Sequence, residues 1–200
     1  MGAKTTHGLL YKPTHRETSW HQKVNDNFDE IDGTGTRNIQ LPLQTGGGIA
    51  DTTISVITGA TSIDFNANGE FALASFQVPN DWNAASDLTL KALVQNEIAE
   101  DDGDDVSFTC TVHGIADGET GADLGQSVAL LLDLTGGDEA INKANVVSGV
   151  IDYDDVTYPI AAGDTVIVKI VANLGGGGEC TGPLHIIDWF VEYTSYRLVD

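Results

Sequence analysis

Basic residues are scarce in this chain of 200 residues. It holds 9 Lys and Arg against 30 Asp and Glu, which gives a formal net charge of −21 at pH 7. Affinity for nucleic acid comes largely from Lys and Arg that neutralise phosphates, and anionic membrane surfaces attract basic segments for the same reason. We therefore expect neither a nucleic-acid partner nor a membrane partner.

Long apolar runs and cysteines are also scarce. No apolar run reaches the roughly 18 residues of a membrane span, and the N-terminus lacks the basic and apolar stretches of a signal peptide, so neither is expected. The two cysteines, Cys110 and Cys180, allow at most one disulfide. Cys110 falls on the core face of an expected strand, where a free thiol behaves as a small apolar group, and this favours reduced cysteines over a bridge.

The charge that is present is unevenly distributed. Residues 1–37 carry five bases and five acids and sum to zero, so residues 38–200 carry the whole −21. Such an asymmetry indicates parts with different surroundings. We expect an N-terminal arm over residues 1–37, a linking segment with short strands over 38–69, and a body over 70–200.

The arm contains one helical pattern, over about residues 18–31. Trp20, Val24, Phe28 and Ile31 follow one another at spacings of four, four and three residues, which places them on one stripe of a short helix. A helix this short needs a surface on which to dock. Docking on its own domain is one alternative; because large aromatics are enriched at interfaces, the stripe favours an assembly contact with other copies or with a partner.

The same stretch carries a resemblance. Gly8-Leu9, Trp20 and Val24-Asn25-x-Asn27-Phe28-x-x-Ile31-Asp32 resemble a segment near the N-termini of structural proteins of tailed viruses. The match covers about 25 residues, and His21 stands where the segment usually has glycine. The resemblance implies an attachment or oligomerisation element.

From residue 38 onward the pattern is that of β-strands separated by turns. Short strands are expected at 54–57 and 62–65, and longer ones at 71–78, 88–94, 106–113, 128–134, 146–152, 165–171 and 184–196. Alternation in the last segment predicts a core face made of Ile187, Trp189, Val191 and Tyr193. About eight strands at this spacing predict an all-β, two-sheet sandwich of the jelly-roll kind.

The body resembles jelly-roll-like modules of tailed-virus virion proteins. The motifs are Phe76-x-Val78-Pro79-x-Asp81, Asp87-Leu88-Thr89-Leu90, Ala161-Ala162-Gly163-Asp164 and Trp189-x-Val191-Glu192-Tyr193. The resemblance implies a rigid, non-enzymatic and often trimeric block. The stretch 97–105 is more acidic than that family's pattern.

No motif indicates catalysis, a cofactor or a metal. The acidic loop 97–105 could gather oxygen ligands for calcium, but it lacks the order of an EF-hand loop, and a solvated hairpin tip is the better interpretation. The glycine run 175–178 is followed by neither a helix nor a lysine and is read as a loop rather than as a phosphate cradle. We expect no catalytic, cofactor-binding or metal-binding residues.

Two functions remain. The first is a non-enzymatic virion structural protein, a homotrimer attached through its arm to capsid or tail proteins at the surface of the virus particle. The alternative is a carbohydrate-binding or adhesin module, with Trp82, Tyr153 and Tyr158 as candidate stacking residues and Trp82 as the exposed one. The acidic body further predicts a high-salt setting, since salt screens its self-repulsion.

Overall fold

Alternation of apolar and polar residues at every second position produces a structure made of strands. The computed structural model describes residues 3–4, 11–12, 34–43, 53–57, 60–116 and 124–196, and in this part of the chain every regular element is a strand. The strands are β1 (Ala3–Lys4), β2 (Tyr11–Lys12), β3 (Thr34–Gln40), β4 (Thr53–Ile57), β5 (Ala60–Phe65), β6 (Phe71–Gln77), β7 (Leu88–Asn96), β8 (Asp105–Ile115), β9 (Gln126–Asp133), β10 (Ala144–Ile151), β11 (Thr165–Asn173) and β12 (Leu184–Tyr196).

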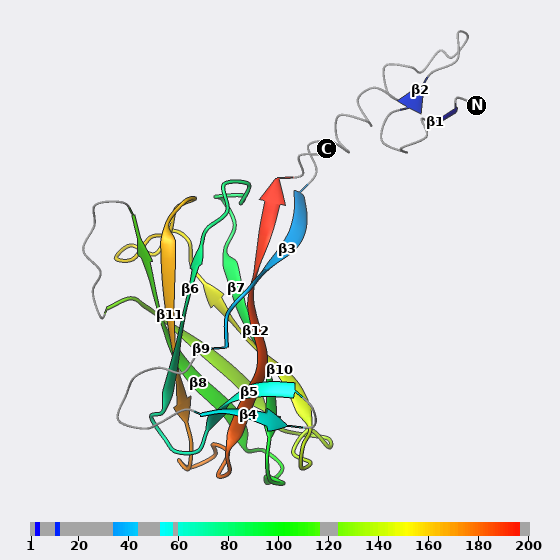
Figure 1. Ribbon diagram of the computed structural model, residues 1–200, viewed down its shortest axis with the longest axis vertical. Helices are drawn as coiled ribbons and strands as arrows, with labels where there is room; N and C mark the ends of the chain where they lie inside the picture. The colour runs from blue at the N-terminus through cyan, green and yellow to red at the C-terminus, as the bar shows by residue number, and fades with distance from the viewer. Residues whose placement is uncertain are drawn as a thin grey trace.

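Two antiparallel sheets face each other (Figure 1). The six-stranded sheet has the order β10-β7-β12-β5-β4, with β3 also paired to β12, and the four-stranded sheet has the order β6-β11-β8-β9. From β5 to β12 the chain crosses to the other sheet at every connection except that between β8 and β9. This crossing pattern is that of an eight-stranded jelly roll, so the predicted all-β jelly-roll sandwich is confirmed.

β3, β4 and β5 belong to the six-stranded sheet. β5 pairs with the start of β12 through Leu184, His185 and Ile186, and β3 pairs with its second half, from Phe190 to Tyr196. β3 and β5 therefore follow one another along the same edge of β12, and β3 lies beside the end of β12 in Figure 1. The segment 38–69, expected as a link between arm and body, thus contributes the end of β3, β4 and β5 to the sheet.

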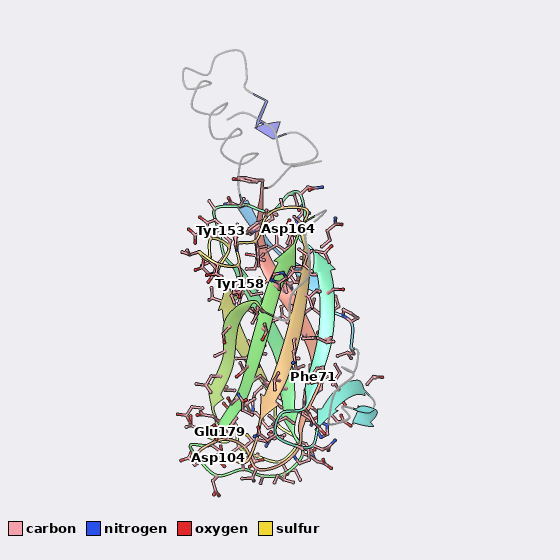
Figure 2. The ribbon with its side chains drawn as sticks, turned by 90° about the vertical axis from the view of Figure 1, so that its left-hand side faces the viewer. Phe71, Asp104, Tyr153, Tyr158, Asp164 and Glu179 are labelled. Carbon is pink, nitrogen blue, oxygen red and sulfur yellow. The ribbon has the colours of Figure 1, made fainter. Side chains whose placement is uncertain are left out.

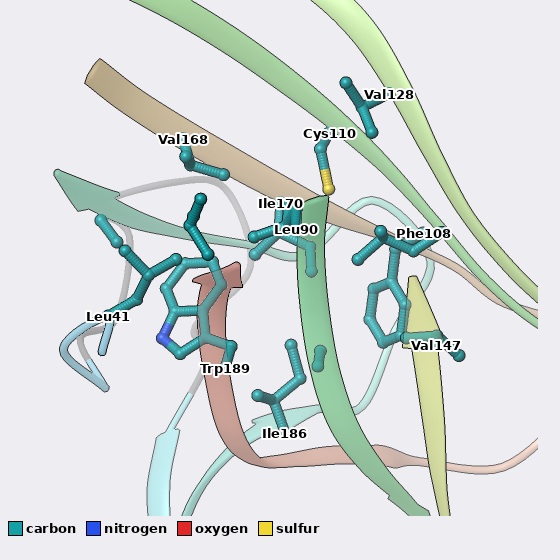
Figure 3. Packing of buried hydrophobic residues seen from close by; sticks show 14 of the residues in the cluster. Leu41, Leu90, Phe108, Cys110, Val128, Val147, Val168, Ile170, Ile186 and Trp189 are labelled. Atoms are coloured by element: carbon teal, nitrogen blue, oxygen red, sulfur yellow. The ribbon is translucent and has the colours of Figure 1, made fainter. Parts of the chain in front are cut away.

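The core lies between the sheets (Figure 3). Phe65 on β5 meets Phe108 on β8 edge to face, with ring centroids 5.4 Å apart. Trp189 is fully buried and donates its indole N–H to the carbonyl of Pro42 at 2.9 Å. Each large apolar side chain buried in this way contributes about 1.5–3 kcal/mol, and the paired indole avoids the cost of an unpaired buried donor.

One predicted face on β12 is wrong. Ile186 is fully buried, together with Trp189, Val191 and Tyr193, whereas Ile187 is only partly buried. The cause is a bulge: the pairing of β12 with β7 shifts register between Ile186 and Asp188. An extra residue at a bulge moves the alternation by one position, so the core face changes from Ile186 to Trp189 without passing through Ile187.

The residues of the predicted assembly contact lie outside the described part of the chain. Trp20, Val24, Phe28 and Ile31, and the helix expected over about 18–31, belong to residues 13–33, which the structure does not describe. They stay predictions. Over the described residues, no helix with the length and apolar character of a membrane span is found.

Candidate functional site

The two ends of the sandwich carry different side chains. Figure 2 shows Tyr153, Tyr158 and Asp164 at one end and Asp104 and Glu179 at the other. The first end contains a cavity of about 580 Å³, within the range of 300–1,000 Å³ typical of small-molecule sites. We call it the Tyr158 pocket; it is lined by His113, Gly114, Ala116, Thr157, Tyr158, Pro159, Ile160, Ala161 and Asp164.

Tyr158 is held in place by its own loop. The carboxylate of Asp155 accepts hydrogen bonds from the backbone N–H of Thr157 at 2.9 Å and of Tyr158 at 2.8 Å. An Asp side chain that binds backbone groups two and three residues ahead fixes a tight turn. The ring of Tyr158 then meets His113 of β8 edge to face, with centroids 5.8 Å apart.

A buried amide anchors that loop to the four-stranded sheet. Gln126 on β9 is only 7% exposed; its Nε2 donates to the carbonyl of Asp152 at 2.9 Å, and its Oε1 accepts from the N–H of Asp152 at 2.8 Å. Ile160, at the far end of the loop, is buried and bonds back to the carbonyl of Tyr153. The loop therefore presents Tyr158 from a prepared position.

Asp164 supplies the carboxylate of the pocket. Its Oδ2 accepts a hydrogen bond from the N–H of Ala161 at 2.8 Å, across a turn in which Gly163 has a φ of 90°. That φ favours glycine, because side chains with a Cβ are strained there. On β8, which also lines the pocket, the buried Nδ1 of His113 has no hydrogen-bond partner among the described residues. The pocket thus combines an aromatic ring, a carboxylate and an imidazole with apolar walls.

The three predicted stacking residues are separated by the structure. Tyr158 lines the pocket, and Tyr153 packs against the core. Trp82 is 2% exposed, donates its indole N–H to the carbonyl of Ser86 and meets Tyr153 at 6.0 Å, so its expected exposure is wrong. Its place beside a turn suggested exposure, but the turn folds the indole inward.

His113 and Asp164 were missed as candidates for this site. Each lies where a strand meets a loop: His113 near the end of β8 and Asp164 directly before β11. A polar residue at a strand end is common on any sandwich. Only the pairing of β8 with β11, which sets Thr165 opposite Ile115, brings these two strand ends together.

The acidic loop 97–105 is anchored by one buried carboxylate. Glu100 is 8% exposed and accepts three hydrogen bonds, from Thr181 N and Oγ1 at 3.0 Å each and from Gly182 N at 2.9 Å. Its neighbours Asp101 and Asp102 are exposed. Across the described residues, no group of three or more His, Cys, Asp or Glu side chains is placed to hold a metal ion.

A second polar network links β5 to β12. His185 and Asp64 are cross-strand partners, both buried, with His185 Nδ1 2.7 Å from Asp64 Oδ1. Ser62 donates to the same carboxylate oxygen at 2.8 Å, and Glu97 Oε2 lies 3.5 Å from His185 Nε2. These bonds satisfy a buried imidazole and hold two strands in register.

Both cysteines are free and fully buried. Cys110 points inward from β8, beside Ile170 of β11 in the core (Figure 3). Burial raises the pKa of the Cys110 thiol to about 12. Burial, together with the charges of Glu100, Asp104 and Asp105, raises the pKa of Cys180 to about 12 as well.

Comparison with known proteins gives distant structural likenesses. No family model and no curated protein matches the chain. Among solved structures, a xylan-binding module CBM15 is 15% identical with a TM-score of 0.42, over 80% of this chain and 97% of that one. The CBM36-1 domain of a multidomain xylanase from the hindgut metagenome of Trinervitermes trinervoides is 11% identical with a TM-score of 0.41, over 79% and 96%. At this low identity and TM-score, the likeness does not assign the ligand of either module to this chain.

Proposed function

We propose that this β-sandwich is a carbohydrate-binding module that takes a saccharide in the Tyr158 pocket. The observation that supports it is the placement of Tyr158, a partly buried ring that lines a 580 Å³ cavity together with the carboxylate of Asp164. A sugar has apolar C–H faces and a polar rim of hydroxyls. An aromatic ring matches the face, and a carboxylate accepts strong hydrogen bonds from the hydroxyls.

The pocket is prepared before any ligand arrives. Asp155 and Gln126 fix the loop that carries Tyr158, and the Ala161 N–H holds Asp164. Little conformational freedom is therefore lost on binding, which favours affinity for small, highly hydrated ligands.

Binding rather than hydrolysis fits the carboxylates of this site. Glycoside hydrolysis generally uses two carboxyl groups on either side of the scissile bond. Among the described lining residues, Asp164 is the one carboxylate. The proposed role is therefore recognition of a saccharide.

The test is glycan binding by the full chain and three variants. Tyr158→Ala should weaken binding at least tenfold, and Asp164→Asn should weaken it severalfold, because the amide no longer offers a charged acceptor. Val156→Ala is the matched control, since Val156 lies on the same loop, is fully exposed and does not line the pocket. Isothermal titration against glycans found on an array measures each affinity; equal affinity for wild type and Tyr158→Ala would reject the pocket.

The virion assignment stays a separate prediction. It rests on the resemblances described above and on Trp20, Val24, Phe28 and Ile31, which lie outside the described residues. A saccharide-binding sandwich carried by an attachment arm would serve as an adhesin on such a particle. A chain lacking residues 1–33, which retains β3 in full, should lose trimer formation if the arm is the assembly element; an unchanged mass in solution would contradict that.

A further inference from the structure

Several carboxylates lie on and against the loop that presents Tyr158, and we call this group the acidic rim. The loop that presents Tyr158 carries Asp152, Asp154 and Asp155 within four positions. Asp87 lies against this loop, since its Oδ1 accepts from the N–H of Tyr153 at 3.4 Å. Asp164 adds a fifth carboxylate from inside the pocket.

The basic side chain that lines the pocket is the imidazole of His113, and no permanently charged cation stands beside it in the described wall of the pocket. Among the described lining residues, none is Lys or Arg. Arg37, which belongs to β3, is paired with Asp81 at 3.0 Å. Lys143 is paired with Asp138 at 3.6 Å, away from the pocket residues.

The carboxylates of the rim act on one another. The pKa of Asp154 is raised, first by its hydrogen bond with Asp152, then by partial desolvation and by the negative charges of Asp152 and Asp87. The Coulombic part of this shift, from Asp152 and Asp87, is the part that reflects a negative local potential. A ligand anion arriving at this rim meets the same repulsion.

We propose that the Tyr158 pocket accepts neutral saccharides and amino sugars and rejects saccharides that carry carboxylate or sulfate groups. This selectivity rests on the proposed function. Hydroxyl groups donate to Asp164 at no electrostatic cost, and an ammonium group gains from the carboxylates around it. A uronate or a sulfate places a negative charge beside Asp164 and close to the acidic loop, and it finds neither Lys nor Arg among the described lining residues.

The first experiment is a glycan array probed with the full chain and with Tyr158→Ala. The array carries neutral glycans, amino sugars, uronates and sulfated glycans in matched series. Signals that depend on Tyr158 should fall on neutral and amino glycans only. Tyr158-dependent signals on acidic glycans would overturn the selectivity and leave the proposed function standing, whereas no Tyr158-dependent signal at all would reject the proposed function itself.

The second experiment separates repulsion from poor fit. The neutral glycan with the strongest signal is compared by titration with its uronate analogue at low salt and at 1 M NaCl. We expect the uronate to bind at least tenfold more weakly than the neutral glycan at low salt. This gap in affinity should narrow severalfold at 1 M NaCl, where the Debye length falls to about 3 Å. A gap that does not change with salt would mean steric misfit and would overturn the electrostatic selectivity.

A variant of the rim gives the matched control. Asp154 is exposed and does not line the pocket, so Asp154→Asn removes charge without removing a contact in the cavity. It should narrow the gap between neutral and uronate ligands at low salt. The control is Asp102→Asn, in an exposed turn of the loop that includes Asp104 at the opposite end of the molecule (Figure 2). It should leave the gap in affinity unchanged. An equal effect of both variants would contradict a local cause.

Discussion

Glu100 is a buried carboxylate whose lost contact with water is replaced by hydrogen bonds from the protein. Two backbone N–H groups and one hydroxyl, from Thr181 and Gly182, bind its two oxygens. These bonds join the loop after β7 to the segment before β12. A buried polar group is tolerated when its hydrogen bonds are complete, and removing it leaves the donors unpaired.

We therefore expect Glu100→Ala to lower the free energy of unfolding by about 2–4 kcal/mol, since it leaves the buried N–H of Gly182 and the part-buried N–H of Thr181 without their acceptor. Urea denaturation followed by tryptophan fluorescence measures the change. Asp102→Ala, in an exposed turn of the same acidic loop, is the control and should stay within about 0.5 kcal/mol of the wild type. A similar small loss in Glu100→Ala would show that its three bonds contribute little.

The two thiols lead to a prediction about reactivity. Because the pKa of both Cys110 and Cys180 is raised to about 12, both side chains stay in the unreactive thiol form at pH 8 in the native protein. A disulfide reagent such as DTNB should find no reactive thiol in the folded chain at pH 8 and two after unfolding in guanidinium chloride. Rapid titration of either thiol in the folded protein would contradict their burial.

The same shifts set the sign of a pH effect. An unfolded thiol has a pKa of about 8.5, so the unfolded chain loses its protons first as the pH rises. The stabilisation from these groups is fully present below pH 8.5 and is lost progressively between pH 8.5 and about 12, the folded value. Substitution of both cysteines by Ala should flatten the fall in stability over this range.

At the scale of strands, sheet closure depends on one glycine. Gly149 of β10 lies against β9 of the opposite sheet: a Cβ there would come within 2.5 Å of the Ala129 carbonyl oxygen and 2.6 Å of a Val128 methyl. A backbone oxygen cannot swing aside as a side chain can. The two sheets therefore approach at this edge only because position 149 has no side chain.

Gly149→Ala should destabilise the protein by about 1–3 kcal/mol, the usual range for overpacking. Gly149 has no positive φ, so the substitution tests crowding rather than backbone strain. Ser148→Ala, one residue away and exposed, is the control and should have little effect. Equal midpoints for both variants in thermal unfolding would mean that β10 can move away from β9.

The strands were predictable because their signal is local. Alternation over 106–113 and its neighbours predicts β6 to β12 closely, and their number and spacing predict the sandwich. The bulge after Ile186 was not predictable, because it depends on how β12 pairs with β7. Of the residues that line the pocket, the sequence predicted only Tyr158 as a binding residue. The position of the loop that carries it depends on Gln126, which bonds to Asp152 across 26 residues of sequence.

At the scale of the whole molecule, acidic side chains of the described residues gather in loops at both ends of the sandwich (Figure 2). The acidic loop that contains Tyr153 occupies one end, and the acidic loop that contains Asp104 occupies the other (Figure 2). The outer face of the four-stranded sheet instead carries neutral side chains such as Leu73, Thr111 and Ile167, with Lys169 placed over the Phe71 ring at 4.5 Å. Repulsion therefore acts mainly within each cluster of loops.

Repulsion within these clusters predicts that salt stabilises the fold. At 0.1 M salt the Debye length is about 10 Å, longer than the spacing of carboxylates within one loop, and at 1 M it is about 3 Å. We expect the melting temperature to rise by about 5 °C or more between low salt and 1 M NaCl, equivalent to roughly 1–2 kcal/mol for a chain of this size. The double variant Asp101→Asn and Asp102→Asn should melt higher at low salt and gain less from NaCl, because two of the repelling charges are gone. If wild type and variant gain equally, the salt effect does not come from this loop; if neither gains, the acidic composition does not indicate a high-salt setting.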